Sequence, residues 1–202
     1  MLTFKPQQVT SKFLKILNDR TRDVLEKRYG LTGSGTTHTL ESIGELYGIT
    51  RERVRQIENH GVQTIQRSKL YDEHASIFDE LEVIIRDHGM IVDEAHLLDS
   101  IAARKEHRPH ILLLLNVGKQ FARTKENQHF TDRWHIDTGV ASAIEDALHT
   151  LDVFRRSITR ANTSIGGSAL PSASIKIRLA NGVLSKVQTF ALREFVITPT
   201  LL

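Results

Sequence analysis

The sequence predicts a mainly α-helical protein in which a helix-turn-helix domain is followed by a winged-helix domain and then by a C-terminal segment of unassigned fold. Apolar residues recur three and four positions apart over much of residues 13–115, between capping residues and glycines. Strand-like runs within residues 1–138 are short and lie near residue 90 and between residues 121 and 136. We place the domains at residues 1–70, 71–138 and 139–202, the last being basic and rich in serine and threonine.

The first domain opens with two short predicted helices. Asn18 or Asp19 can cap the second of them, and Gly30 ends it. The apolar residues of the two helices have helical spacing: Phe13, Leu14, Leu17, Val24, Leu25 and Tyr29. The polar residues 32–39 favour a turn before the next helix.

A helix-turn-helix is predicted from residue 39 onward. Thr39 caps a helix of two turns, and Gly48 supplies the left-handed residue that ends it. Thr50 caps a longer helix that runs from residue 51 to about residue 67. A helix, a tight turn with glycine and a longer helix are the signature of this motif. Gly44 would leave room where the two helices cross steeply.

The longer helix has one apolar face and one polar face. The apolar face should pack on the core and contains Val54, Ile57, Gly61 and Ile65. The polar face contains Glu52, Arg55, Gln56, Asn59, Gln63 and Gln66, with Arg51 at its edge. Arginine, glutamate and glutamine match the hydrogen-bonding patterns of guanine, cytosine and adenine in the major groove, so the first turns could contact bases.

A solvated charged surface is the simpler interpretation of this polar face. However, Arg51, Arg53 and Arg55 occupy the first turns of the helix, where the helix dipole favours acidic residues. A bound anion such as a DNA phosphate would explain arginines at these positions. Together with the glycine-containing turn and the capping Thr50, they favour a DNA-binding helix.

The most specific stretch is Thr-Arg-Glu-Arg-Val-Arg-Gln-Ile-Glu at residues 50–58, preceded by Thr-Leu-Glu-Ser-Ile-Gly-Glu-Leu-Tyr-Gly-Ile at residues 39–49. With the helix before it, this stretch resembles region 4 of the bacterial primary sigma factors, over residues 14–68. The resemblance implies a domain that binds the promoter −35 element in double-stranded DNA and rests on the β flap of RNA polymerase. The basic residues usual in that family after residue 58 are replaced in this chain by Asn59-His-Gly-Val-Gln.

The resemblance also implies which side chains contact DNA. Arg51, Glu52 and Gln56 are expected to contact bases. A second set is expected to contact the DNA backbone or a partner protein: Thr39, Thr50, Arg53, Arg55 and Asn59. The parts of a sigma factor that grip the polymerase clamp and open the −10 element are not expected in this chain, so we do not expect a complete sigma factor.

Residues 71–138 predict a winged helix made of three helices and a terminal hairpin. Gly89 ends the first helix, Asp93 caps the second, and Pro109 begins the third. The hairpin strands are expected near residues 121–123 and 133–136. Separate folding of the two domains is expected from their separate apolar sets: Val24, Leu25, Ile43, Val54 and Ile57 in the first, and Phe78, Leu81, Leu98, Leu113 and Trp134 in the second.

This second domain resembles, less specifically, the winged helix-turn-helix of the RNA polymerase δ subunit and its HARE-type relatives. Its third helix is mostly leucine and isoleucine, so protein contact or scaffolding is expected there rather than base contact. Single cations in the wing could contact phosphate or be ordinary surface residues: Lys119, Arg123, Lys125 and Arg133.

The charge distribution supports different partners for the two domains. Residues 1–70 carry 12 basic and 7 acidic residues, whereas residues 71–140 carry 8 basic and 13 acidic residues. A basic segment suits a polyanion, and an acidic one repels DNA but suits a basic protein groove. We expect a sequence-specific DNA-binding transcription protein that contacts a −35-like site through the major groove. The alternative is an RNA polymerase-associated, δ-like accessory protein that uses the sigma-like fold for protein docking.

No enzymatic activity, metal or cofactor is expected. The absence of cysteine removes disulfides, thiolate zinc sites and cysteine nucleophiles, and it fits a cytoplasmic protein. The histidine pairs His107 with His110 and His129 with His135 lack the spacing of a zinc site. There is no nucleophile elbow or phosphate-binding glycine loop. Neither a signal peptide nor an apolar run long enough to span a membrane is recognisable.

Overall fold

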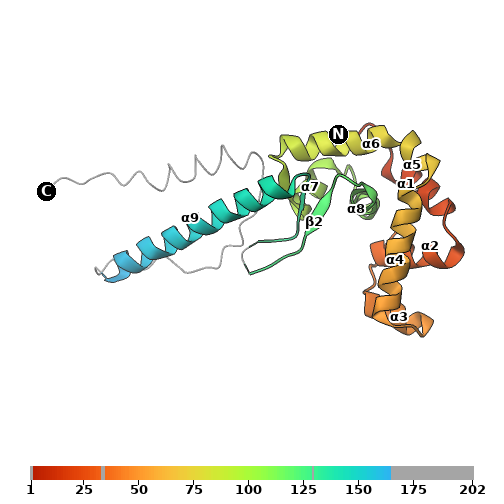
Figure 1. Cartoon of the computed structure of the whole chain (residues 1–202), viewed down its shortest axis with the longest axis horizontal. Helices are drawn as coiled ribbons and strands as arrows, with labels where there is room; N and C mark the ends of the chain where they lie inside the picture. Colours follow the sequence, from red (N-terminus) through yellow and green to blue (C-terminus); the bar gives the residue numbers. More distant parts are fainter. Residues whose placement is uncertain (1, 33–34, 129, 165–202) are drawn as a thin grey trace. The chain divides into compact units, whose positions relative to one another are not determined.

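The computed structural model describes residues 2–32, 35–128 and 130–164, with side chains as far as residue 151 (Figure 1). These residues form helices and one small three-stranded sheet, which confirms the mainly α fold class. Residues 165–202 of the C-terminal segment that the sequence left unassigned lie outside the described residues.

In chain order the elements are α1 (Pro6–Lys15), α2 (Asp19–Tyr29), α3 (Leu40–Tyr47), α4 (Arg51–Gln66), α5 (Lys69–Glu73), α6 (Ala75–Asp87), β1 (Ile91–Asp93), α7 (Glu94–Ile101), the 3-10 helix η1 (Lys105–His107), α8 (Arg108–Val117), β2 (Ala122–Thr124), β3 (Arg133–His135) and α9 (Thr138–Ser164). They belong to two compact units. Unit 1 comprises the described residues up to Ile84 together with Leu97–Phe121, and unit 2 comprises Ile85–His96 together with the described residues after Phe121.

The predicted helix ends agree with the structure at several positions. The Asn18 carboxamide oxygen accepts a hydrogen bond from the Thr21 backbone N–H at 2.8 Å, so Asn18 rather than Asp19 caps α2. Gly30 ends α2 in the left-handed conformation, with φ 66°. Helix α4 ends at Gln66, close to the expected end near residue 67, and Ser68 then caps the short helix α5.

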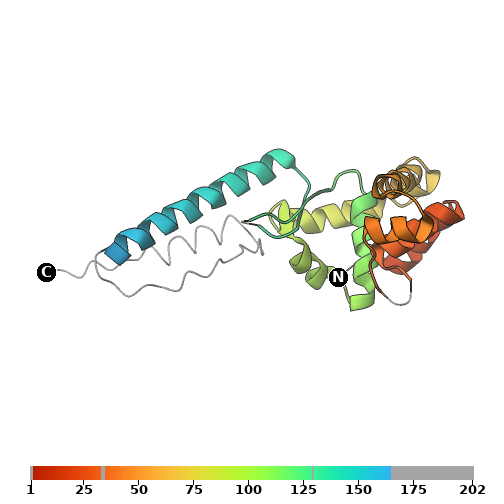
Figure 2. The same cartoon turned by 90° about the horizontal axis from the view of Figure 1, so that it is seen from below.

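In unit 1, helix α8 packs against α1, α2 and α4 (Figure 2). Its side chains are buried on nearly every side: Ile111, Leu113, Leu114, Leu115 and Val117. The Gln66 carboxamide N–H donates to the Val117 carbonyl at 2.9 Å, which ties the end of α4 to the end of α8. A helix buried to this extent cannot enter a DNA groove, and within unit 1 it serves as a scaffold for α1, α2 and α4.

An aromatic cluster joins α1 to α5 and α6 within the same unit. The Phe13 and Phe78 rings are stacked with centroids 6.3 Å apart, and the Tyr71 and Phe78 rings with centroids 4.6 Å apart. Phe13 belongs to the first expected domain, whereas Tyr71 and Phe78 belong to the second. The boundary expected at residue 70 therefore lies inside one packed unit, close to the end of the sigma-like sequence.

Unit 2 contains the antiparallel sheet, in the strand order β1-β3-β2. Val92 and Arg123 both lie opposite Trp134 of the central strand. The Trp134 indole N–H donates to Glu94 at 2.8 Å, and Arg123 pairs with the same carboxylate at 2.7 Å. Along the chain, α6, β1, α7, α8, β2 and β3 follow the element order expected for a winged helix.

Helix α9 occupies the first part of the segment that the sequence left unassigned. Its Ala141 and Leu148 are buried in one cluster with Ile91 and Phe130. Nearby, the Arg133 guanidinium is 1% exposed and donates to the Glu145 carboxylate of α9 at 2.5 Å. The helix begins at Thr138 and therefore continues the ordered structure past the expected domain boundary.

Candidate nucleic-acid interface

The turn between α3 and α4 depends on two glycines with different roles. Gly48 ends α3 with φ 64°, a conformation that residues with a Cβ rarely adopt. Gly44 lies inside α3, and a Cβ added there would be 2.6 Å from the carbonyl oxygen of Ile49. The room at Gly44 is therefore needed by the backbone of the turn rather than by a crossing helix. The Ile49 N–H donates to the Gly44 carbonyl at 2.9 Å, which fixes that backbone.

Threonine caps set the start of both helices of the motif. The Thr39 hydroxyl accepts from the Ser42 N–H at 3.1 Å, and the Thr50 hydroxyl accepts from the Arg53 N–H at 3.2 Å. Each hydroxyl satisfies one of the N–H groups that the first turn of a helix leaves without a partner. Thr50 therefore fixes where α4 begins and, with it, the positions of the charged residues in its first turns.

The inner side of α4 packs closely on the rest of unit 1. Val54 is fully buried and forms one cluster with Val24 of α2 and Ile43 of α3. A Cβ at Gly61 would be 2.7 Å from a methyl group of Thr21, so α4 and α2 approach each other closely at this point. This packing holds the opposite face of α4 toward solvent (Figure 1).

Ion pairs and hydrogen bonds organise the charged residues on the exposed side of α4. The Arg51 guanidinium lies 2.9 Å from the carboxylate of Glu41 in α3. Arg55 donates two hydrogen bonds to the Glu52 carboxylate, at 2.8 and 2.7 Å. Arg53 has no carboxylate partner among the described residues and donates instead to the Gln56 carboxamide oxygen, at 3.1 Å. The cationic first turns of α4 are therefore partly neutralised by the protein itself.

The Glu52–Arg55 pair stays ionised around neutral pH. The hydrogen bonds from Arg55 lower the pKa of the Glu52 carboxyl, and the same bonds raise the pKa of the Arg55 guanidinium. Both side chains are more than half exposed, so the pair is accessible to a ligand that offers competing partners.

A hollow of about 410 Å³ lies between the start of α2 and the edge of α4. It is lined by Asn18, Arg20, Thr21, Arg53, Gln56, Ile57 and His60. Arg20 also lies over the Tyr47 ring, 5.5 Å from its centroid. Two arginines and a histidine around one open hollow suit an anionic group such as a backbone phosphate.

On the other side of α4, Glu58 belongs to a partly buried network. The Tyr29 phenol hydrogen-bonds to the Glu58 carboxylate and accepts a hydrogen bond from the Asn116 carboxamide of α8. Burial and the nearby Glu58 charge raise the pKa of Tyr29, so the phenol stays protonated. Arg28 lies 3.6 Å from the same carboxylate. Glu58 is thereby used for internal contacts between α2, α4 and α8.

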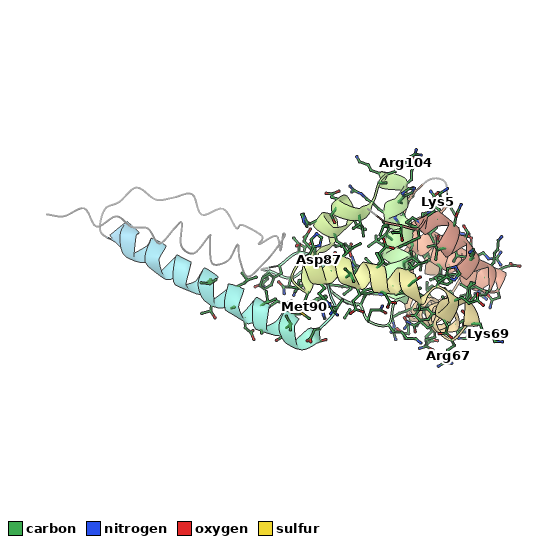
Figure 3. All side chains as sticks on the ribbon, turned by 90° about the horizontal axis from the view of Figure 1, so that it is seen from above. Lys5, Arg67, Lys69, Asp87, Met90 and Arg104 are labelled. Atoms are coloured by element: carbon green, nitrogen blue, oxygen red, sulfur yellow. The ribbon has the colours of Figure 1, made fainter. Side chains whose placement is uncertain are left out.

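Two basic residues lie at the far end of α4, where α5 begins. Arg67 and Lys69 are both exposed there (Figure 3). They follow the stretch from Asn59 in which the sequence lacks the basic residues usual in sigma region 4. Basic residues are therefore present at the end of α4, about two turns after Asn59.

Comparison with known proteins identifies this part of the chain. Residues 13–67 match the family described as Sigma-70, region 4. These residues form a region 4 domain. In sigma factors, region 4 is the DNA-binding region that recognises the −35 element, and it also binds RNA polymerase through the β flap.

The relatives that match over this part are sigma factors. The RNA polymerase principal sigma factor HrdD of Streptomyces griseus is 36% identical over 67 residues, which are 33% of this chain and 20% of HrdD. SigA of Nostoc sp. is 47% identical over 55 residues, 27% of this chain and 14% of SigA. SigA1 of Synechococcus elongatus is 49% identical over 53 residues, 26% of this chain and 13% of SigA1. The chain thus covers a fifth or less of the length of these relatives.

The residues of the region 4 domain that were predicted to contact DNA or a partner are accessible in the structure. Arg51, Glu52 and Gln56, expected to contact bases, are all exposed. The residues expected to contact the DNA backbone or a partner are Thr39, Thr50, Arg53, Arg55 and Asn59, and all of them are exposed or partly exposed. The hollow adds Arg20 and His60, which sequence reasoning did not select because they belong to different turns of different helices.

Within the described part of the chain, no group of three or more histidine, aspartate or glutamate side chains is arranged to hold a metal ion. His135 is buried, and its Nε2 hydrogen-bonds to the Thr124 hydroxyl at 3.1 Å. His129 lies outside the described residues. None of the described helices is long and apolar enough to cross a bilayer.

Proposed function

We propose that this chain is a sequence-specific DNA-binding transcription protein whose region 4 domain contacts a −35-like site in the major groove. The observation that carries the proposal is the exposed face of α4, on which Arg51, Glu52 and Gln56 lie in the first two turns after the Thr50 cap. The first turns of the second helix are the part of a helix-turn-helix that contacts base edges. A site in a promoter would place the protein in the cytoplasm.

The side chains on this face have complementary hydrogen-bonding abilities. Arg51 can donate two hydrogen bonds to guanine, Gln56 can pair with adenine, and Glu52 can accept from cytosine. Glu52 and Gln56 must first leave their partners Arg55 and Arg53. Exposed pairs of this kind contribute about 0–1 kcal/mol, so their exchange for base contacts is energetically accessible.

Contacts to the DNA backbone would orient the domain. Arg53 and Arg20 line the hollow beside α4, and His60 completes its basic lining. We assign this hollow to a phosphate group next to the bases that α4 contacts, because phosphate contacts fix the register of a protein on the duplex. Thr39, at the start of α3, offers a second such contact through its exposed helix end.

A second candidate function is that of an RNA polymerase accessory protein, in which the region 4 fold and the δ-like winged helix dock on protein. The acidic charge of residues 71–140 favours it. Neutralising the exposed acids Asp72, Glu73 and Asp79 in the full chain should weaken capture of core polymerase if this docking is the main role. Unchanged capture would leave DNA binding as the better account. In this second candidate function, the region 4 domain would dock on the β flap of RNA polymerase.

The DNA-binding proposal is tested by substitutions on α4 of the full chain. Arg51→Ala and Gln56→Ala should each lose about 1–3 kcal/mol of discrimination at one base-pair position. Arg53→Ala should weaken binding to all sequences alike, because Arg53 lines the phosphate hollow. Binding of each variant to a panel of duplexes with single base-pair changes measures these losses. Equal, sequence-independent losses from all three variants would refute base contact by α4.

A further inference from the structure

The Glu41 carboxylate lies at the surface that the proposed function turns toward DNA. It is the second residue of α3, and its Oε1 atom lies 2.9 Å from Nη1 of Arg51, the first residue of α4. The pair therefore bridges the turn between the two helices. Both side chains are more than half exposed, at 54% and 66%. A carboxylate beside a polyanion is unfavourable, so its presence next to a DNA-contacting arginine requires a reason.

The reason lies in how the two arginines of this face use their donors. Arg55 presents Nε and Nη2 together to Glu52, so the edge that could bind a base in two places is occupied. Arg51 contacts Glu41 through Nη1. A guanidinium has five N–H donors, so the edge formed by Nε and Nη2 of Arg51 remains available for guanine.

We propose that Glu41 is a specificity-determining residue that positions the Arg51 guanidinium for base contact. The inference rests on the proposed function of α4. By holding Nη1, Glu41 restricts the rotation of a long side chain and directs its opposite edge away from α3. The negative charge of Glu41 also disfavours binding of a DNA phosphate by Arg51. Glu41 thus strengthens discrimination between bases and weakens binding to DNA of any sequence.

The test uses the full chain and duplexes obtained by selection from random DNA with the wild-type protein. Binding is measured for the selected duplex, for versions with each base pair replaced in turn, and for a scrambled duplex. The variants are Glu41→Gln, Glu41→Asp, Arg51→Ala and the double variant Glu41→Gln with Arg51→Ala. Glu45→Gln is the matched control, because Glu45 is exposed on the same helix but does not pair with Arg51.

Glu41→Gln should bind the scrambled duplex more tightly and lose about two- to fivefold of the discrimination at the position that Arg51 contacts, the range of an exposed ion pair. Glu41→Asp keeps the charge but shortens the side chain, so it should lose discrimination without tighter binding to the scrambled duplex. In the double variant, discrimination should equal that of Arg51→Ala alone. Glu45→Gln should resemble Glu41→Gln on the scrambled duplex and keep full discrimination.

Unchanged discrimination in both Glu41 variants, where Arg51→Ala loses it, would overturn the inference and leave the proposed function intact. Equal losses at every base-pair position would also overturn it, because they indicate a general distortion of the domain. Thermal unfolding of each variant identifies such distortion. If Glu41→Gln does not fold, the loss of discrimination in Glu41→Asp tests the inference. A wild-type protein without any sequence preference would overturn the proposed function and this inference together.

Discussion

Replacing Gly44 by alanine should destabilise the helix-turn-helix, although alanine is normally the better residue in a helix. The added Cβ would lie 2.6 Å from the Ile49 carbonyl oxygen, whereas real Cβ atoms essentially never approach closer than 3.0 Å. The turn must therefore move by at least 0.4 Å. The atom it meets belongs to the backbone, and the N–H of the same residue is bonded to the Gly44 carbonyl, so rotation of a side chain cannot relieve the contact.

The expected size of the effect follows from two opposing contributions. Overpacking costs about 1–3 kcal/mol, and about 2–3 kcal/mol is expected here because the added Cβ meets backbone that cannot rotate away. The higher helix propensity of alanine returns about 1 kcal/mol. The Gly44→Ala chain should therefore lose about 1–2 kcal/mol of unfolding free energy, which lowers the melting temperature by about 2–8 °C for a chain of this size.

Chemical denaturation of the full chain, combined with DNA binding, measures the effect of Gly44→Ala. Gly139→Ala is the matched control, because its Cβ would meet only the end of the Asp137 side chain, at 3.3 Å. That variant should be neutral or slightly stabilised, with unchanged DNA binding. Gly44→Ala should bind DNA more weakly, because the angle between α3 and α4 changes. Equal or higher stability of Gly44→Ala would refute the role of Gly44 in the turn.

Three other changes have definite expected outcomes. Tyr29→Phe removes the phenol that bonds Glu58 and Asn116, and it should cost about 1 kcal/mol in denaturant titrations; no change would mean that the network is replaced by water. Glu145→Ala leaves the buried Arg133 without its carboxylate and should cost about 3 kcal/mol, measured in the same way; a cost below that of an exposed pair would contradict the burial of this contact. Burial lowers the pKa of His135, so the folded state favours the neutral ring, and stability should fall as the pH decreases below about 6.5, where the unfolded histidine binds a proton. His135→Phe should reduce this loss between pH 7 and pH 5, and an identical pH dependence in both chains would exclude His135 as a contributor.

Local features of the region 4 domain could be predicted from the sequence because they depend on neighbouring residues. The caps at Thr39 and Thr50 and the left-handed Gly48 are determined by residues within one turn of helix. The role of Gly44 required the structure, since only the path of the turn shows which backbone atom approaches it. The Arg51–Glu41 contact joins two helices and depends on side-chain rotamers, which periodicity does not determine.

Long-range packing was the least predictable property. The apolar residues of α8 indicate a buried helix, but their periodicity does not indicate that its partners are α1, α2 and α4. The stacking of Phe13 on Phe78 similarly joins segments 65 positions apart in the sequence. The helix α9 was not predicted from the sequence, although Ala141, Ile144 and Leu148, which pack in unit 2, have helical spacing. The division of residues 1–138 into two separately folding domains at residue 70 stays a prediction.

The central claim is that α4 contacts bases without help from another protein. Selection from a pool of random duplex DNA with the full chain, in the presence and in the absence of RNA polymerase, tests this claim most directly. We expect enrichment of one sequence motif by the chain alone, and loss of preference at a single position of that motif in the Arg51→Ala chain. Enrichment only when polymerase is present, or no enrichment in either case, would contradict it.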